Sequence, residues 1–295
     1  MTSLPVRTRP PQTRAEKLRP RRPRQRMWVQ HVVLIPAAAL FAFPFYWLVV
    51  MSTSRTSEIF GSPPRLIPGS QLFENMGRLF GSVNFHQAFL NSVFVSVVAT
   101  TVTVAIAALS GFVFAKFRFP GRDWLFAILL VTMTLPTGVM LVPMFQIYVE
   151  LGWINTYLPL IVPGAASAFG IFWMRQAARE AVSDEVIEAA RVDGAGFLRV
   201  FWHVGAPALR PAIAGFTVFQ FMWNWNEYLW PLLVLNDSAK YTLPVALQQL
   251  NGSHGTSDYP VVMTATLLAT IPLIVLFLFF RRMVMSSVTS GAVKG

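Results

Sequence analysis

Cysteine is absent from the 295 residues of the chain, and charged residues make up only 13%. Without cysteine there is no disulfide, no thiol nucleophile and no cysteine-based metal site. The four histidines form no H-E-x-x-H pair, and no G-x-x-x-x-G-K-[ST] phosphate loop occurs. We therefore predict no catalytic residue and no metal site, and we expect any ATP hydrolysis to belong to a partner protein.

Hydrophobic residues, in contrast, make up 54% of the chain, and the mean hydropathy is +0.52. Several apolar runs are long enough to cross a bilayer as helices. The predicted fold class is an all-α polytopic membrane protein with six transmembrane helices. We place the spans at about residues 32–51, from 89–92 to 114, 124–148, 158–174, 212–235 and 259–280.

The net charge of +11 would suggest nucleic acid binding in a soluble protein, but the placement of the charges indicates topology instead. Twenty of the 24 Lys and Arg residues lie in the N-terminal tail, in the loop after the second span, in residues 175–210 or at the C-terminus. The other four are Arg55, Arg65, Arg78 and Lys240. Because cytoplasmic loops carry the excess of Lys and Arg, we expect both termini to be cytoplasmic and no nucleic acid partner.

Three regions follow from this pattern. Residues 1–31 are predicted to be a basic, disordered cytoplasmic arm, 32–282 the transmembrane domain, and 283–295 a cytoplasmic tail. The arm either anchors the topology or also contacts anionic membrane lipid.

Two spans carry unusual residues. In the second, small and weakly polar side chains recur every three or four residues, which suits either close helix packing or the lining of a pathway. In the third, Pro136 and Pro143 predict kinks, because proline removes a backbone donor. Such kinks serve either a gate or packing alone.

Residues 183–211 form an amphipathic segment between the fourth and fifth spans, which we call the docking loop. Ser183 is a residue type that caps helices, and acidic Asp184 and Glu185 follow in the first turn. We expect this helix to end near Val192, followed by a turn at Gly194. A second short helix should then present one apolar face and end at two prolines; these residues are Phe197, Val200, Phe201, Val204, Pro207 and Pro211.

The docking loop resembles the Glu-Ala-Ala loop of type I ABC importer permeases of the carbohydrate-importer type. The spacing from Glu188 through Gly194 to Pro207 matches that signature, and residues 291–295, Gly-Ala-Val-Lys-Gly, resemble the C-terminal tail of sugar permeases. The resemblance implies that the loop couples the permease to an ATPase. The coupling residues that it implies are Glu188, Ala189, Ala190, Asp193, Gly194, Ala195, Phe197, Phe201 and Pro207.

The same resemblance implies partners and a location. It implies a heterodimer with a second permease subunit, a cytosolic ATPase dimer that binds ATP and Mg, and an extracytoplasmic solute-binding protein. The chain itself would bind no cofactor. It would be a multi-pass protein of the bacterial or archaeal inner or plasma membrane.

The fifth span has a polar face. Gln220, Asn224 and Glu227 follow one another at i, i+4 and i+7, with Trp223 beside them. Because an acidic side chain in lipid is costly, we expect this face to point into the bundle or a cavity. These four residues form the predicted substrate pathway, and the alternative is an interhelical hydrogen-bond clamp.

Two other function classes fit less well. A secondary transporter for a small polar solute would need its own ion site and usually shows an internal repeat, and we find neither. An intramembrane enzyme would need a nucleophile with its base, or a metal cluster. The transported solute is not predicted beyond a sugar or related carbohydrate.

Overall fold

The computed structural model describes residues 24–59, 61–63, 65–136, 138–250 and 258–292. Every regular element among the described residues is a helix, so the predicted all-α class is confirmed. The chain divides into two compact units, Met1–Trp47 and Leu48–Gly295.

The first unit holds most of helix α1 (Arg24–Ser52), which contains Pro36 and Pro44. The helix begins inside the region predicted to be the arm, and residues 1–23 lie outside the described residues. In the part of α1 that belongs to this unit, the apolar side chains are largely exposed, as expected for a helix whose surroundings are lipid.

The second unit contains the remaining helices. They are α2 (Thr56–Ile59), α3 (Leu72–Ser82), α4 (Phe85–Lys116), α5 (Arg122–Thr132), α6 (Leu141–Glu150), α7 (Leu158–Ile161), the 3-10 helix η2 (Pro163–Ala166), α8 (Ala168–Ala181), α9 (Asp184–Val192), α10 (Phe197–Val200), the π-helix η3 (Phe201–Gly205), α11 (Ala206–Trp225), α12 (Leu229–Val234), the 3-10 helix η4 (Ser238–Lys240), α13 (Leu243–Leu250) and α14 (Tyr259–Ala292).

Four segments among the described residues are long and apolar enough to cross a membrane: His31–Ser52, Phe85–Lys116, Leu158–Ala181 and Tyr259–Met283. They correspond to the first, second, fourth and sixth predicted spans. The other two predicted spans are each divided into two helices. The third breaks between α5 and α6, around Pro136, and the fifth breaks between α11 and α12.

The segment from residue 52 to residue 90 is less irregular than predicted. It contains α2 and α3, and α4 already begins at Phe85, because Asn84 caps that helix by accepting a hydrogen bond from the Gln87 amide at 3.4 Å. Asn75 of α3 is fully buried and donates to the carbonyl oxygens of Ser52 and Ser54. The segment before the second span is therefore partly helical and held by hydrogen bonds rather than an irregular loop.

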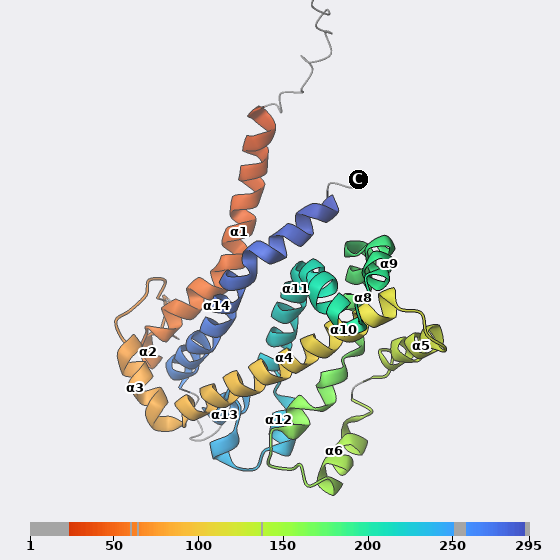
Figure 1. Cartoon of the computed structure of the whole chain (residues 1–295). Coiled ribbons are helices and arrows are strands. Elements are labelled where there is room, and N and C mark those ends of the chain that lie inside the picture. Colours follow the sequence, from red (N-terminus) through yellow and green to blue (C-terminus); the bar gives the residue numbers. More distant parts are fainter. Residues whose placement is uncertain (1–23, 60, 64, 137, 251–257, 293–295) are drawn as a thin grey trace, which may run out of the picture. The chain divides into compact units, whose positions relative to one another are not determined.

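Helix α4 lies at the centre of the second unit, with α8 and α11 packed beside it (Figure 1). Its small and weakly polar stripe is buried against these neighbours. At Gly111 the approach is so close that an added Cβ would lie 2.5 Å from Met174 Cβ. Gly111, which was not part of the predicted stripe, therefore allows a close contact between α4 and α8 that a residue with a side chain would prevent.

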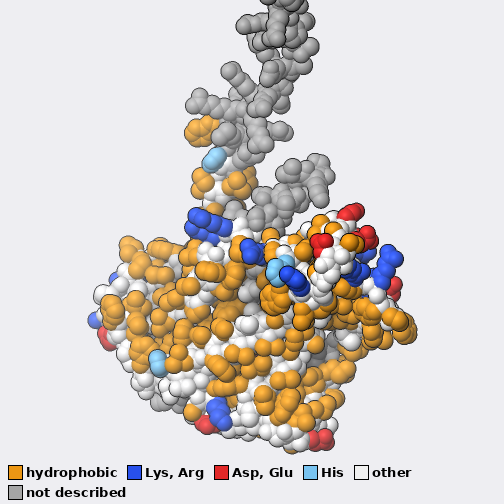
Figure 2. Space-filling model, viewed as in Figure 1, with side chains coloured by type: hydrophobic (Ala, Val, Ile, Leu, Met, Phe, Trp, Pro, Cys, Tyr) orange, Lys and Arg blue, Asp and Glu red, His pale blue; other side chains and the backbone are white. Residues whose placement is uncertain are grey.

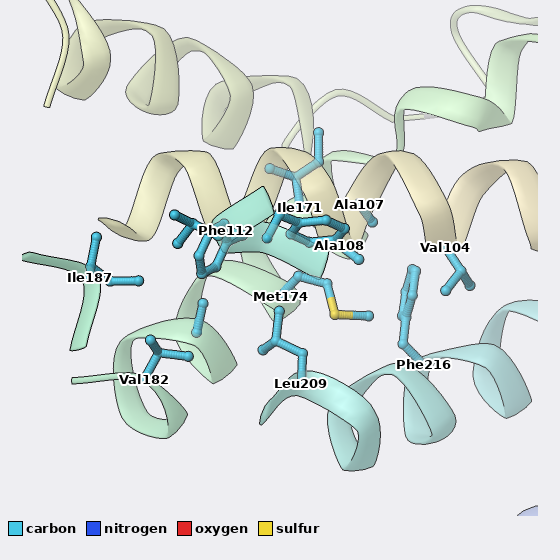
Figure 3. Packing of buried hydrophobic residues seen from close by; sticks show 13 residues of the cluster. Val104, Ala107, Ala108, Phe112, Ile171, Met174, Val182, Ile187, Leu209 and Phe216 are labelled. Carbon is cyan, nitrogen blue, oxygen red and sulfur yellow. The ribbon is translucent and has the colours of Figure 1, made fainter. Parts of the chain in front are cut away.

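The largest buried cluster joins α4, α8, the docking loop and α11. Figure 3 shows Phe112 among side chains from all four, with Met174 and Leu209 close by. On the face seen in Figure 2, hydrophobic side chains cover most of the second unit and charged side chains gather at its margins. This distribution suits a bilayer with water on both sides.

Candidate functional site

The docking loop folds as two short helices around a tight turn. Ser183 occupies the N-cap position of α9, but its side chain makes no capping bond to the helix. Gly194 has φ +75°, a conformation that glycine adopts without strain, and its amide donates to the Arg191 carbonyl at 3.0 Å. The predicted helix, its end at Val192 and the glycine turn all match the structure.

The second half of the docking loop differs from the prediction. Pro207 and Pro211 do not end it: α10 continues through the π-helix Phe201–Gly205 into α11, and both prolines lie in α11. Pro207 lies just after the π-helix, and Pro211 lies inside α11. The loop therefore passes into the fifth span without a break.

The apolar face of the second helix also points elsewhere than expected for a docking surface. Val200 and Phe201 are 2% and 5% exposed, and the Phe201 ring packs at 5.5 Å from Phe112 of α4. Phe201 was predicted as a coupling residue, but it belongs to the protein's own core. The same holds in part for Phe197, which is half-buried against Phe117.

The exposed side of the loop consists of other residues. Glu188, Ala189, Asp193, Gly194 and Pro207 are exposed, whereas Ala190 and Ala195 are half-buried. Apolar side chains that sequence reasoning missed are exposed next to them: Val192, Leu198 and Trp202, at 88%, 58% and 65%. Their signal in the sequence is the i, i+4 spacing of Leu198 and Trp202, on the opposite side from Val200.

Neighbouring groups favour the ionised form of the two carboxylates at the start of α9. Lys116 Nζ donates to Asp184 Oδ1 at 2.8 Å, and this hydrogen bond, with the lysine charge, lowers the pKa of Asp184. A hydrogen bond to its own backbone amide, with another from the Ser183 hydroxyl, lowers the pKa of Glu185. Both carboxylates are therefore ionised near neutral pH and face the N-terminus of α9, whose dipole favours negative charge.

The predicted pathway residues lie together near the end of α11. Gln220 Nε2 donates to Asn224 Oδ1 at 3.2 Å, and Asn224 Nδ2 donates to Thr100 Oγ1 of α4 at 3.1 Å. Gln220 is 9% exposed and Trp223 is 63% exposed. Thr100 belongs to the small, weakly polar stripe predicted in the second span, but its hydrogen bond to Asn224 was not predicted.

Glu227 has a different setting from the predicted one. It lies in the break after Trp225 rather than inside a helix, and its Oε1 accepts hydrogen bonds from the amides of Leu229 and Trp230 at 3.0 and 3.2 Å. The carboxylate thus caps the first turn of α12. Glu227 therefore does not continue the helical face of Gln220 and Asn224, because α11 ends at Trp225.

All four predicted residues nevertheless line one pocket of about 420 Å³, which we call the polar pocket. Its opposite wall comes from residues 138–148 and 159–164, including the segments at which the third and fourth spans bend. Trp230, which flanks the polar face in the sequence, also lines this pocket, and the ring centroid of Tyr148 lies 5.3 Å from that of Trp230. Tyr148 is the aromatic residue of the pocket that the sequence did not point to. Amide, carboxylate and aromatic groups in one cavity suit a ligand with hydroxyl groups and apolar ring faces.

Among the described residues no group of His, Cys, Asp or Glu side chains could hold a metal ion. The polar pocket offers hydrogen-bonding and stacking groups to a ligand, and the docking loop presents exposed acidic and apolar side chains above a buried base.

Comparison with known proteins gives the family. Residues 104–290 match the family model described as binding-protein-dependent transport system inner membrane component. The lactose transport system permease protein LacG of Rhizobium radiobacter is 35% identical over 266 residues, which cover 90% of this chain and 96% of that protein.

Two further relatives are similar over most of their length. The arabinooligosaccharides transport system permease protein AraQ of Bacillus subtilis is 32% identical, covering 87% of this chain and 92% of the relative. The sn-glycerol-3-phosphate transport system permease protein UgpE of Yersinia pestis is 32% identical, covering 85% and 92%.

A solved structure shares the fold. One chain of a bacterial ABC transporter that imports the acidic polysaccharide alginate superposes with a TM-score of 0.77 at 24% identity, over 93% of this chain and 99% of that one. The family match covers more than half of the chain, and the lactose permease is similar along nearly all of it. The chain therefore belongs to the inner membrane components of binding-protein-dependent transport systems, the permease subunits of ABC importers, and is a transport subunit rather than an enzyme.

Proposed function

We propose that this permease imports a sugar or related carbohydrate, and that its docking loop couples closure of a separate ATPase to alternating access. The observation that supports the coupling role is that one side of the docking loop is exposed while the other side is packed into the protein core. Glu188, Ala189 and Asp193 face outward, while Ile187 and Val200 beneath them are 3% and 2% exposed. A small exposed surface on a packed base can transmit force from a partner without unfolding.

The partner of this surface is a cytosolic ATPase dimer, which binds ATP and Mg. Glu188 would meet polar or basic groups in its cleft, since an exposed carboxylate gains most from an opposite charge on the partner. The coupling residues are then Glu188, Ala189, Ala190, Asp193, Gly194, Ala195 and Pro207, with Phe197 and Phe201 holding the loop from below.

The carbohydrate assignment rests on two kinds of support. The similar permeases are named for lactose, arabinooligosaccharides and glycerol phosphate. The polar pocket offers the amides of Gln220 and Asn224, the Glu227 carboxylate and an exposed Trp223. Sugars are bound by such groups, because hydroxyls pair with amides and carboxylates while apolar ring faces stack on aromatics.

The remaining partners follow from the family. A second permease completes the pathway as a heterodimer, and an extracytoplasmic solute-binding protein delivers the solute. Both termini and the docking loop lie in the cytoplasm, as the distribution of Lys and Arg favours.

The test is the assembled importer in proteoliposomes with its ATPase, second permease and binding protein. Glu188→Lys should leave assembly of the transmembrane part intact but weaken ATPase binding, lower solute-stimulated ATP hydrolysis and abolish most uptake. Glu180→Lys is the matched control, since Glu180 is an exposed acid at the end of α8, outside the docking loop.

Unchanged stimulation and uptake with Glu188→Lys would rule out the coupling role. Equal losses with both substitutions would point to a general effect of the charge and would also contradict it. The carbohydrate assignment is checked separately by the ligand that the purified binding protein retains.

A further inference from the structure

The docking loop is attached to more than the two helices that it connects. At the start of α9, Asp184 pairs with Lys116, the last residue of α4, at 2.8 Å. The side chains differ in exposure, 6% for Lys116 and 76% for Asp184, so the lysine lies beneath the loop and reaches up to it. An ammonium group with so little access to water depends on this carboxylate for its pairing.

The next residue, Phe117, contacts both helices of the loop. The Arg191 guanidinium lies over its ring at 4.7 Å from the centroid, and the Phe197 ring packs edge-on at 5.0 Å. Arg191 is at the end of α9 and Phe197 begins α10, so one aromatic ring bridges the Gly194 turn. Cation–π and edge-to-face contacts both favour a defined orientation.

A third attachment lies deeper. The Phe112 ring of α4 packs at 5.5 Å from Phe201, and a Cβ on Gly205 would come within 2.9 Å of it. Phe112, Ile187 of α9 and Met174 of α8 belong to the same buried cluster, which Figure 3 shows from close by. The loop and one end of α4 therefore share a single packed core, which resists independent movement.

The other end of this connection is the polar pocket. Thr100 of α4 accepts the hydrogen bond from Asn224, which lines that pocket. Helix α4 contains no proline, and from Lys116 to Thr100 it spans about 24 Å at 1.5 Å per residue. An unbroken helix of this length can carry a displacement from the docking loop to the pocket.

We propose that Lys116 and Phe117 are positioning residues that fix the docking loop to α4, so that the loop, α4 and Thr100 move as one body when the ATPase closes. The polar pocket is then reshaped through the Thr100–Asn224 contact. This inference rests on the proposed coupling function and adds the route by which movement reaches the pocket.

The first test uses charge exchange in the reconstituted importer. Lys116→Glu should preserve assembly and basal ATP hydrolysis but lower uptake per ATP hydrolysed several-fold, because the loop and α4 then repel each other. Lys116→Glu combined with Asp184→Lys should restore the ratio. Arg122→Glu is the matched control: Arg122 pairs with its neighbour Asp123 at 2.9 Å, outside the docking loop, and its change should leave the ratio unaltered.

The second test measures the distance between the docking loop and α4 directly. Because the chain has no cysteine, spin labels can be placed at Ser183→Cys and Val97→Cys, which are both exposed. The distance distribution between the labels should be the same in the nucleotide-free and ATP-bound importer. When Phe117→Ala is added, the distribution should become broader or differ between the two states. A distance that changes between the two states with Lys116 and Phe117 intact would overturn the proposal.

The two levels of inference fail separately. If Glu188→Lys uncouples the importer while Lys116→Glu and Phe117→Ala leave uptake per ATP unchanged, the loop couples but α4 is not the route. If Glu188→Lys itself has no effect, the coupling function is wrong. Failure of the exchanged pair to restore coupling, with the complex assembled, would also contradict the role of Lys116.

Discussion

Asn224 of α11 donates a hydrogen bond to the Thr100 hydroxyl of α4 across 3.1 Å, and it simultaneously accepts one from Gln220. Thr100 is 3% exposed and Gln220 is 9% exposed, so both partners of Asn224 have little contact with water. Asn224 itself lines the polar pocket. It thus joins two helices and forms part of a ligand cavity at once. The two roles can be separated experimentally.

Replacing Thr100 by valine removes the acceptor but none of the amide or carboxylate groups that line the polar pocket. We expect a loss of stability of about 0.5–1.5 kcal/mol, because a part-buried hydrogen bond between α11 and α4 is lost. Uptake per ATP hydrolysed should fall, because the contact through which α4 reshapes the polar pocket is lost, whereas the Michaelis constant and the preference among sugars should stay near normal. Transport and ATP hydrolysis of the purified, reconstituted complex measure both.

Asn224→Ala should lower stability to a similar extent and should in addition change the Michaelis constant or the preference among several sugars. If uptake follows complex yield equally in both variants, Asn224 is only an interhelical clamp, and the pathway role is wrong.

Gly194→Ala should weaken the docking loop through the backbone alone. A Cβ there would meet nothing within 4 Å, but φ is +75°, which costs a residue with a side chain about 1–2 kcal/mol. Gly196→Ala is the matched control, since Gly196 also has open space and has φ −68°. Solute-stimulated ATP hydrolysis should fall in Gly194→Ala and stay unchanged in Gly196→Ala. Equal rates of stimulated hydrolysis in the two variants would mean that the left-handed turn at Gly194 is not needed for coupling.

Gly111→Ala should loosen the packing of α4 on α8. The new methyl group would lie 2.5 Å from Met174 Cβ and 2.7 Å from the Arg175 amide nitrogen, so the helices must separate, at a cost of about 1–3 kcal/mol. Gly77→Ala in α3, where nothing lies within 4 Å, should be neutral or slightly stabilising. Thermal unfolding of the detergent-solubilised complex distinguishes them, and an unchanged melting temperature for Gly111→Ala would contradict the close contact.

The orientation in the membrane can be checked with single cysteines. Ser70→Cys and Ser238→Cys should react with an impermeant maleimide added to intact cells, whereas Ser183→Cys should react only after the membrane is opened. All three positions are exposed, so access to water is not limiting. Labelling of Ser183→Cys from outside would reverse the predicted topology.

Local chemistry made much of the docking loop predictable. The acidic first turn, the helix end at Val192 and the left-handed Gly194 depend on neighbours within a few residues. What the apolar face of the second helix packs against was not predictable in the same way. Phe197, Val200 and Phe201 show only that one face is apolar, and whether it meets a partner or the protein's own α4 depends on the fold.

The fifth span shows the same division. Spacing placed Gln220 and Asn224 on one face, and they do bond to each other; Glu227 follows the same spacing, but the helix ends before it. Prolines at 207 and 211 suggested a stop, yet the helix continues through both, with a π-helical turn just before Pro207.

The sequence by itself determined the helical class, the apolar spans, the asymmetry of charge and the signature of the docking loop, because these depend on composition and on spacing within one helix or turn. The tertiary structure decided that Phe201 is core, that Thr100 completes the polar network and that Lys116 and Phe117 attach the docking loop to α4. Those contacts join residues far apart in the chain, and only close packing of the helices brings them together.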